Sequence, residues 1–443
     1  MSAEKQSSKL AADSTWPIDR VKDHVSKIGS GVTPWGGAAS YLDYGVPLLR
    51  SQNVHFDGLR LDDVAFIAPD TNEEMRGTKL QSRDVLLNIT GASIGRCAFV
   101  PDGFGEGNVN QHVCIIRPTA RLNYRFLTYC LSAPWGQDQI FSGFTGASRQ
   151  GLGLRDLGEI QVPLPPLPEQ HRIAIYLDVS CAAIDAAIVA KRRQIEALDT
   201  LKESIVENAV TRGERRAPKL RKLDQDWISS LPENWTAVRI KRVVTRVDYG
   251  ISVSTESEGI FPVLKMGNIQ SGEIVYTKME YVDDVPEELI LEKNDLLYNR
   301  TNSPDQVGKA ALFRGEQHDR VTFASYLVRL RANHRIQPEF LNYVVNCDGF
   351  LGFARRLAIP SVQQSNLNST RYCRMMIPLP PIDEQESICR YLVEKLGELK
   401  RVVTCIQSQI TTLTNYRKSL IHECVTGQRR ITESDLNRVE AHG

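Results

Sequence analysis

The sequence lacks the short motifs that mark most catalytic and metal-binding proteins. It contains no Gly-x-x-x-x-Gly-Lys-Ser/Thr loop, which excludes a P-loop nucleotidase. None of its nine cysteines has Cys-x-x-Cys spacing, and none of its eight histidines falls in a His-Glu-x-x-His motif. We therefore expect neither a zinc site nor a disulfide framework, and the cysteines are typical of reduced thiols in an intracellular protein.

Long apolar segments are also missing. No run approaches the roughly 20 apolar residues that are needed to cross a bilayer. The polar start, residues 1–15, has no apolar core and does not resemble a secretory signal. These absences predict a cytoplasmic protein with a flexible N-terminal tail and no membrane partner. The net charge of +1 does not decide whether nucleic acid is bound, because binding depends on local basic patches.

Three stretches resemble catalytic motifs only superficially. Residues 151–158, GLGLRDLG, lack the final glycine of a dinucleotide-binding loop. The sequences LPPL and LPPI lack the polar and aromatic residues that an adenine methyltransferase places around its two prolines. Glu398, Leu399 and Lys400 have the spacing of a nuclease motif but lie in a predicted coiled coil. We therefore expect no catalytic, cofactor-binding or metal-binding residue, so the chain should bind and not catalyse.

The clearest positive feature is an internal repeat. PLPPLPEQHRIAIYLD (163–178) returns 215 residues later as PLPPIDEQESICRYLV (378–393), with nine of sixteen positions identical. The stretches VPLLRSQNV (46–54) and FPVLKMGNI (261–269) match more weakly at the same separation. Repeats of this kind indicate a duplicated unit. The unequal divergence indicates that the proline-rich segments keep one pattern while the regions before them differ.

Each half is predicted to be a mixed α/β (α+β) globular domain followed by a long helix. Short apolar segments such as DVLLNI and DLLYNR read as strands, and Gly-rich turns separate them. After each set of prolines, apolar residues recur at alternating spacings of three and four, as in a coiled-coil seam. The predicted seam residues are Ile184, Ile188, Ile195, Leu198, Ile205, Leu399, Val403, Ile406, Ile410, Leu413 and Leu420. Charged residues occupy three further seam positions, Lys191, Lys202 and Arg417.

The order of the segments restricts how these helices can pair. If the first helix leads from the first domain to the second, the second helix must start at the second domain and run back. The two seams then form an antiparallel intramolecular coiled coil with approximate two-fold symmetry; pairing with another chain is the alternative. The predicted segments are a tail (1–15), a first domain (16–165), a central helical spacer (166–213), a linker (214–234), a second domain (235–380), a C-terminal helical spacer (381–427) and a tail (428–443).

Four loops in the two domains are rich in the side chains that contact phosphates and base edges. Two come from the first domain and two from the second, so the pattern is itself repeated. The predicted DNA-binding residues are Asn88, Thr90, Ser93, Arg96, Ser148, Arg149, Gln150, Arg300, Asn302, Ser303, Gln306, Lys309, Ser361, Gln363 and Gln364. An ordinary solvated loop is the alternative for any one of them.

Two dissimilar α/β domains that alternate with two similar helices, each entered by Pro-Leu-Pro-Pro-x-x-Glu-Gln, resemble the specificity subunit of a type I restriction-modification enzyme. The resemblance extends over residues 16–427. It implies that each domain is a target-recognition domain that reads one half of a bipartite, asymmetric sequence in double-stranded DNA. The helices would set the spacer and dock two methyltransferase subunits. The residues implied in this docking are Glu169, Gln170, Tyr176, Glu384, Gln385 and Tyr391.

The same resemblance implies the remaining partners and the role of the complex. Two restriction subunits would add ATP-dependent translocation and DNA cleavage, as a defence against foreign DNA. S-adenosylmethionine, ATP and magnesium would be bound by the partner subunits, with no cofactor in this chain. Two other readings stay open on the residues alone: a coiled-coil scaffold that joins two domains for ligands other than DNA, and an enzyme with an unrecognised site.

Overall fold

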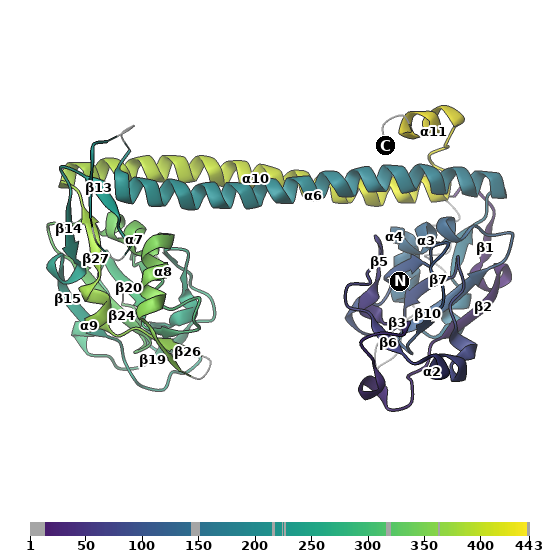
Figure 1. The fold of residues 1–443 in the computed structure, drawn as a ribbon, viewed down its shortest axis with the longest axis horizontal. Coiled ribbons are helices and arrows are strands. Elements are labelled where there is room, and N and C mark those ends of the chain that lie inside the picture. Colours follow the sequence, from purple (N-terminus) through teal and green to yellow (C-terminus); the bar gives the residue numbers. More distant parts are fainter. Residues whose placement is uncertain are drawn as a thin grey trace. The chain divides into compact units, whose positions relative to one another are not determined.

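The computed structural model describes residues 14–142, 151–214, 218–223, 225, 227–315, 320–361 and 364–440 (Figure 1). The chain forms two compact units. The first unit comprises residues up to Lys191 together with those from Gln407 onward, and the second unit comprises Arg192–Ile406. Each unit joins a globular domain to parts of two long helices, α6 (Leu167–Arg212) and α10 (Ile382–Thr426).

The first unit is built on an antiparallel four-stranded sheet with the order β2-β10-β7-β8. Alternate residues of its central strands face two different cores. Val85 and Leu87 pack toward helix α3, whereas Leu86 packs toward the second, three-stranded sheet. Because both faces are covered, all four residues of β7 are buried and the strand reads as a continuous apolar run.

The elements of the first unit besides α6 and α10 are β1 (Ile18–Arg20), β2 (Val25–Ser30), β3 (Val46–Leu49), β4 (Val54–His55), β5 (Gly58–Leu59), β6 (Ala65–Ile67), α2 (Pro69–Glu74), β7 (Val85–Asn88), β8 (Cys97–Phe99), β9 (Asn108–Val109), β10 (Val113–Pro118), α3 (Tyr124–Ser132), α4 (Pro134–Ser142), α5 (Leu154–Gly158), β11 (Gln161–Pro163) and α11 (Glu433–Glu440). Strand β1 pairs with β11, and β3 pairs with β6 and β9. Strand β1 is the first element of the chain, and helix α11 follows α10 as the last. Both end segments are therefore folded where the structure describes them.

The second unit repeats this topology. Its four-stranded sheet has the order β15-β24-β20-β22, and its three-stranded sheet has the order β19-β16-β23. The elements are β12 (Leu220–Lys222), β13 (Ser230–Pro232), β14 (Thr236–Arg239), β15 (Val244–Tyr249), β16 (Phe261–Leu264), β17 (Ile269–Gln270), β18 (Glu273–Ile274), β19 (Glu280–Val282), β20 (Asp295–Asn299), β21 (Thr301–Asn302), β22 (Ala310–Leu312), β23 (Thr322–Phe323), β24 (Leu327–Ala332), α7 (Pro338–Asn346), α8 (Asp348–Leu357), β25 (Ile359–Ser361), β26 (Gln364–Asn366), α9 (Ser369–Arg374) and β27 (Met376–Leu379). The matching strand orders confirm the predicted duplication and the mixed α/β class.

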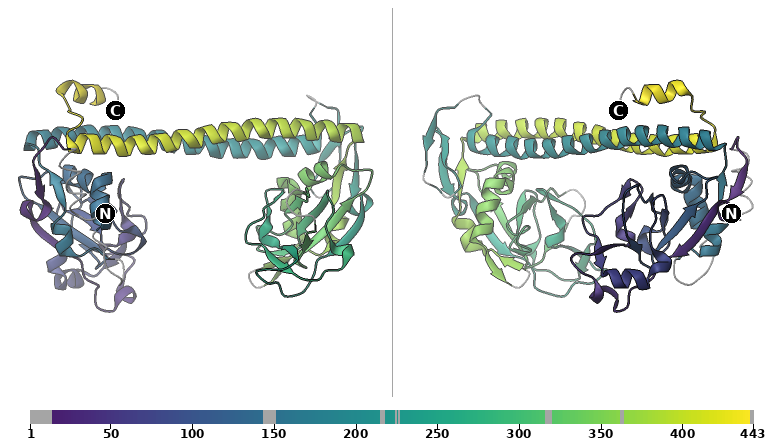
Figure 2. Two further views of the ribbon diagram at one scale, coloured as in Figure 1. Left: turned by 180° about the vertical axis from the view of Figure 1, so that it is seen from behind. Right: turned by 45° about the vertical axis from the view of Figure 1, so that its right-hand side comes forward.

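Helices α6 and α10 run without a break, even though Gly397 lies inside α10 (Figure 2). Each ends at a glycine with a left-handed backbone, Gly213 (φ 79°) and Gly427 (φ 80°), a conformation in which glycine avoids the clash of a Cβ atom. The predicted linker 214–234 contains the β12–β13 hairpin, and the predicted tail 428–443 contains α11. The predicted tail 1–15 lies outside the described residues except for its last two positions.

Within each unit the two long helices pair antiparallel, which confirms the intramolecular coiled coil. In the first unit Ile184 and Ile188 share a core with Leu420 and Cys424. In the second unit Val210 shares a core with residues 388 and 392 of α10. All eleven predicted apolar seam residues are buried or half-buried.

The three charged residues at predicted seam positions differ in their exposure and in their partners. Arg417 is half-buried and pairs with Asp185 at 3.2 Å. Lys191 donates from Nζ to Gln409 Oε1 at 2.5 Å. Lys202 is exposed, so the prediction that it lies in the seam is wrong. The polar residues that remain in the seam are thus matched across it, which fixes the register of the two helices.

The sequence prediction of no membrane-length apolar run needs a correction at α6. By length and composition alone, an 18-residue stretch of α6 is apolar enough to cross a membrane. Its residues Ile173, Leu177 and Ile184 are buried in the core of the first unit. Packing against the globular domain and α10 therefore accounts for the apolar character of this helix.

A glutamine locks each long helix to its globular domain. Gln170 Oε1 accepts the backbone N–H of Asn123 at 2.8 Å, and Nε2 donates to the carbonyl oxygens of Pro165 (2.9 Å) and Arg121 (3.2 Å). Gln385 repeats the arrangement with the N–H of Gln337 (2.8 Å) and the carbonyl oxygens of residues 380 (2.9 Å) and 335 (3.1 Å). Both side chains are buried, so the conserved pattern within the repeat builds a rigid joint.

Replacing Gln385 with alanine should lower the free energy of unfolding of the second unit by about 1 to 3 kcal/mol, because a buried N–H and two carbonyl groups lose their partner. Urea unfolding followed by hydrogen exchange of peptides from residues 330–390 measures the effect. Gln407→Ala removes an exposed glutamine from the same helix and should change the stability by less than about 0.5 kcal/mol. Equal effects of the two variants would contradict the locking role.

Candidate functional site

The two loops predicted to face DNA after the third strand of each main sheet are equivalent turns. In the first unit the N–H of Asn88 donates to the carbonyl oxygen of Arg96, and the N–H of Gly95 donates back to Asn88, both at 2.9 Å. In the second unit Asn299, Lys309 and Gly308 make the same two bonds at 2.8 Å. Gly95 (φ 85°) and Gly308 (φ 86°) provide the left-handed residue that closes each turn.

The second predicted loop of each unit lies beside the first. In the first unit the N–H of Leu152 donates to the carbonyl oxygen of Ile89 at 2.8 Å. In the second unit the N–H of Leu367 donates to the carbonyl oxygen of Arg300 at 2.8 Å, and β21 pairs with β26. The structure therefore brings together residues about 60 positions apart at one edge of each sheet. We call these two places the loop edges of the units.

Several predicted contact residues hold the first loop edge together. Asn88 is fully buried and donates to the Ser51 carbonyl (2.7 Å) and to Ser93 Oγ (3.2 Å). The prediction that Asn88 faces DNA is therefore wrong, because its side chain positions the loop from inside. Thr90 is half-buried, with Oγ1 at 2.6 Å from His112 Nδ1. Arg96 is half-buried and has no ion-pair or hydrogen-bond partner for its side chain among the described residues.

The second loop edge has different chemistry on the same backbone. Arg300 lies over the Tyr249 ring, 5.0 Å from its centroid, and donates from Nη1 to the Ser325 carbonyl at 3.3 Å. Asp305 accepts from Ser303 Oγ at 2.7 Å and from Gln306 Nε2 at 2.5 Å. The hydrogen bond from Ser303 is the main reason that the pKa of Asp305 lies below its usual value, so the carboxylate stays charged and organises the loop.

The remaining predicted contact residues fall into three groups. In the second unit Lys309 donates to Gln306 Oε1 at 2.9 Å, and Asn302 Oδ1 accepts the N–H of Ser303 at 2.8 Å. Ser361 and Gln364 are exposed on β25 and β26. Ser148, Arg149, Gln150 and Gln363 lie outside the described residues. Their contact with DNA stays a prediction.

Sequence reasoning missed residues that reach the loop edges from other segments of each unit. In the first unit these are Thr33, Gln111 and His112, which lie in turns next to the strands. In the second unit they are Tyr249 of β15 and Tyr326, which lies in the turn before β24. Tyr326 is 46% exposed, and its carbonyl oxygen accepts the N–H of Arg300 at 2.9 Å. No local pattern marks these residues, because the register of antiparallel strands far apart in the sequence places them there.

The residues predicted to bind partner subunits take part in contacts inside each unit. Glu384 accepts from Asn234 Nδ2 (2.8 Å) and from Trp235 Nε1 (2.6 Å). Glu169 is buried and pairs with Arg172. The buried Tyr176 and the half-buried Tyr391 pack into the two cores, and Gln170 and Gln385 form the joints. An intramolecular role explains the repeat of these residues, and partner contact by any of them stays a prediction.

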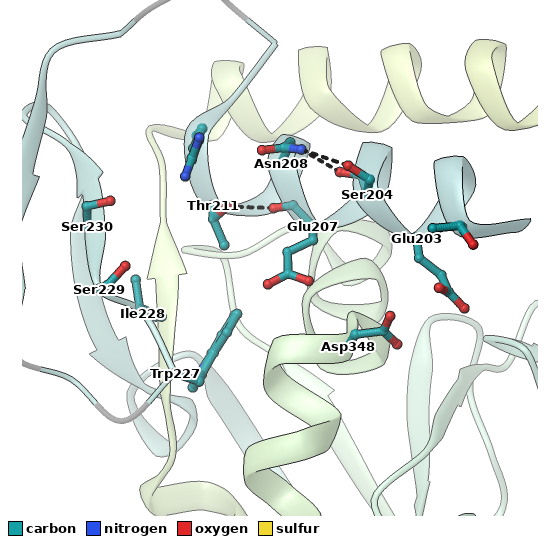
Figure 3. A pocket seen from close by; sticks show the side chains of 12 residues that line it. Glu203, Ser204, Glu207, Asn208, Thr211, Trp227, Ile228, Ser229, Ser230 and Asp348 are labelled. Carbon is teal, nitrogen blue, oxygen red and sulfur yellow. Dashed lines mark hydrogen bonds between the residues drawn. The ribbon is translucent and has the colours of Figure 1, made fainter. Parts of the chain in front are cut away.

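A pocket of about 370 Å³ in the second unit is lined by three carboxylates, one arginine (Arg212) and several neutral polar side chains. Figure 3 shows the side chains of Glu203, Glu207 and Asp348 around it, together with the ring of Trp227. The carboxylates outnumber Arg212 and give the pocket a net negative charge, which disfavours the DNA backbone. Within the described ranges, no group of three or more His, Cys, Asp or Glu side chains is arranged to hold a metal ion. The loop edges are therefore the candidate nucleic-acid interface.

Comparison with known proteins gives a consistent result over nearly the whole chain. Residues 47–197 and 232–401 match the family described as the type I restriction modification DNA specificity domain. The EcoKI specificity subunit of Escherichia coli (strain K12), a type I restriction enzyme subunit, is 21% identical over 403 residues, which cover 88% of this chain and 84% of that protein. The MjaVIII specificity subunit of Methanocaldococcus jannaschii is 22% identical over 436 residues, which cover 95% of each chain.

Two solved structures share the fold. A chain from a structure of a type I R-M system, determined to explain complex assembly and conformational transition, has a TM-score of 0.71 at 15% identity and covers 93% of this chain and 97% of its own. The HsdS subunit from Thermoanaerobacter tengcongensis has a TM-score of 0.53 at 16% identity, with 94% and 97% covered. The family match extends over more than half of the residues, in two copies. This chain belongs to the type I restriction-modification DNA specificity family.

Proposed function

We propose that this chain is the DNA sequence-specificity subunit of a type I restriction-modification complex. The observation that carries the proposal is the pair of loop edges. Two domains of one topology present amide, hydroxyl and imidazole groups in the first unit and a guanidinium with tyrosines in the second. Groups of these types read base edges and phosphates. Two different readers on one chain fit a bipartite target with two unlike halves.

The long helices serve as the spacer between the two readers and as the docking region for two methyltransferase subunits. The locked joints at Gln170 and Gln385 support this role, because a ruler must be rigid where it meets each reader. The chain itself is non-catalytic and binds no cofactor. Partner subunits supply S-adenosylmethionine for adenine methylation, and two restriction subunits supply ATP- and magnesium-dependent translocation and cleavage. The complex acts in the cytoplasm against foreign DNA.

A domain exchange tests the proposal. Replacing residues 16–160 with the first domain of another family member should change one half of the methylated sequence and leave the other half and the spacer unchanged. Sequencing of methylated adenines in DNA treated with the assembled complex gives the result. Binding should also weaken steeply with added salt, because phosphate contacts release counterions.

Two outcomes contradict this function. One is methyl transfer by the isolated chain, which would make it an enzyme. The other is a complex whose methylated sequence does not respond to the exchanged domain, which would favour a scaffold that joins domains for ligands other than DNA.

A further inference from the structure

Gln111 is exposed and yet held in one orientation at the first loop edge. Thr33 Oγ1 donates to Gln111 Oε1 at 2.5 Å, and Gln111 Nε2 lies 3.0 Å from His112 Nε2. The imidazole extends this series of hydrogen bonds, because His112 Nδ1 lies 2.6 Å from Thr90 Oγ1. A free surface glutamine samples many rotamers, so these contacts reduce the entropy that a new contact would cost.

The positions of the protons in this series of hydrogen bonds follow from the chemistry of its side chains. An amide nitrogen can only donate, so His112 Nε2 accepts from Gln111. The neutral imidazole then carries its proton on Nδ1 and donates it to Thr90 Oγ1. The series of hydrogen bonds thus runs from Thr33 through the Gln111 amide and the His112 imidazole to Thr90, which belongs to the predicted DNA loop.

The loop that carries Thr33 is fixed by its backbone. The N–H of Gly31 donates to the carbonyl oxygen of Val113 at 3.0 Å. A Cβ atom at Gly31 would lie 2.0 Å from the Val109 carbonyl oxygen, so only glycine allows this close approach. Thr33 therefore approaches Gln111 from a backbone that cannot move away without breaking this contact.

The amide of Gln111 keeps one hydrogen-bond donor and one acceptor for a ligand. A glutamine side chain has two N–H donors and two acceptor lone pairs, and the contacts above use one of each. An amide with one donor and one acceptor left can bind the N7 acceptor and the N6 amino group of adenine in the major groove. We propose that Gln111 reads an adenine in the half-site bound by the first unit, with Thr33 and His112 as positioning residues. This proposal rests on the function proposed above.

The second unit has no amide at this position. Equivalent backbone hydrogen bonds flank Gln111 in the first unit and Ser325 in the second, so the two residues occupy the same position. Arg300 donates to the Ser325 carbonyl oxygen. Arg300 Nε is buried and has no partner among the described residues. The two half-sites therefore meet different chemistry at one equivalent place, which makes Arg300 a control that acts on the other half-site.

The test uses the complex of the full chain with its methyltransferase subunits and a DNA library with both half-sites randomised. Sequencing the methylated molecules gives the base preference at each position. Gln111→Glu removes the N–H donor and leaves acceptors only, which suits the amino group of cytosine. We expect the preference for adenine at one position of one half-site to fall by about 10- to 100-fold and a preference for cytosine to appear there.

Four further variants separate reading from general damage. Gln111→Ala should lose the same discrimination without gaining cytosine, and Thr33→Val should reduce it at the same base pair only. Gln81→Glu makes the same charge change at another exposed site of the first unit and should alter no position. Arg300→Lys should act on the other half-site alone.

The outcomes distinguish this inference from the proposed function. A wild-type complex that methylates adenine without sequence preference would overturn the function itself. A selective wild-type complex whose base preferences are the same with Gln111→Glu and Gln111→Ala would overturn the role of Gln111 and leave the function intact. A change confined to one adenine, with Gln81→Glu silent, supports the inference.

Discussion

Replacing Asp295 with alanine should lower the free energy of unfolding of the second unit by about 3 to 5 kcal/mol, because the half-buried Arg331 loses its bidentate partner and the buried Arg329 loses a neighbouring carboxylate. Asp295 is almost fully buried and accepts from Arg331 Nε at 2.7 Å and Nη2 at 2.9 Å. Arg329 has no exposed side-chain surface; its Nη2 pairs with Asp248 Oδ2 at 2.6 Å, and its Nη1 lies 3.6 Å from Asp295 Oδ2. The hydrogen bonds that Arg331 donates to Asp295 hold the pKa of Arg331 above its usual value, so the guanidinium stays charged.

Hydrogen exchange of the full chain in urea measures this effect, and peptides of the second unit should lose protection first. Asp284→Ala removes an exposed carboxylate from the same unit and should change the stability by less than about 0.5 kcal/mol. Asp84→Ala provides a matched test in the first unit, because Asp84 binds Arg117 in the same way at 2.7 and 2.8 Å. Loss of protection in both units after a single substitution would contradict their separate cores.

Removing seven residues from each long helix should shorten the spacer of the recognised sequence by about three base pairs. Deleting residues 198–204 and 396–402 takes one heptad from facing stretches and keeps the apolar seam in register. Each helix loses about 10 Å at 1.5 Å per residue, and one base pair occupies about 3.4 Å. Sequencing of methylated adenines with the assembled complex gives the preferred spacer.

The half-sites should be unchanged in this double deletion, because the loop edges lie outside the deleted segments. A length-preserving variant with Asp199, Thr200 and Glu203 changed to alanine alters the exposed face of the same heptad and should keep the original spacer. Methylation that continues at the original spacing after the double deletion would rule out the helices as a ruler.

Local patterns in the sequence predicted the duplication, the long helices and their seam. Prolines and a heptad repeat act over a few residues, so their meaning does not depend on distant contacts. Asn88 and Gln170 show the limit of this reading. Both are polar residues of the kind that bind DNA or a partner, yet the fold buries both and uses them to satisfy its own backbone.

The sequence by itself determined that the chain is a duplicated pair of α/β domains with paired helices, because repeats and heptads are written in consecutive residues. Only the tertiary structure decided which side chains meet at each loop edge. Thr33, Thr90, Gln111 and His112 come from three separate segments of the first unit, and the register of antiparallel strands sets them within hydrogen-bond distance of one another. A one-residue change of register would move the turns that carry these side chains past one another, and no local pattern records that choice.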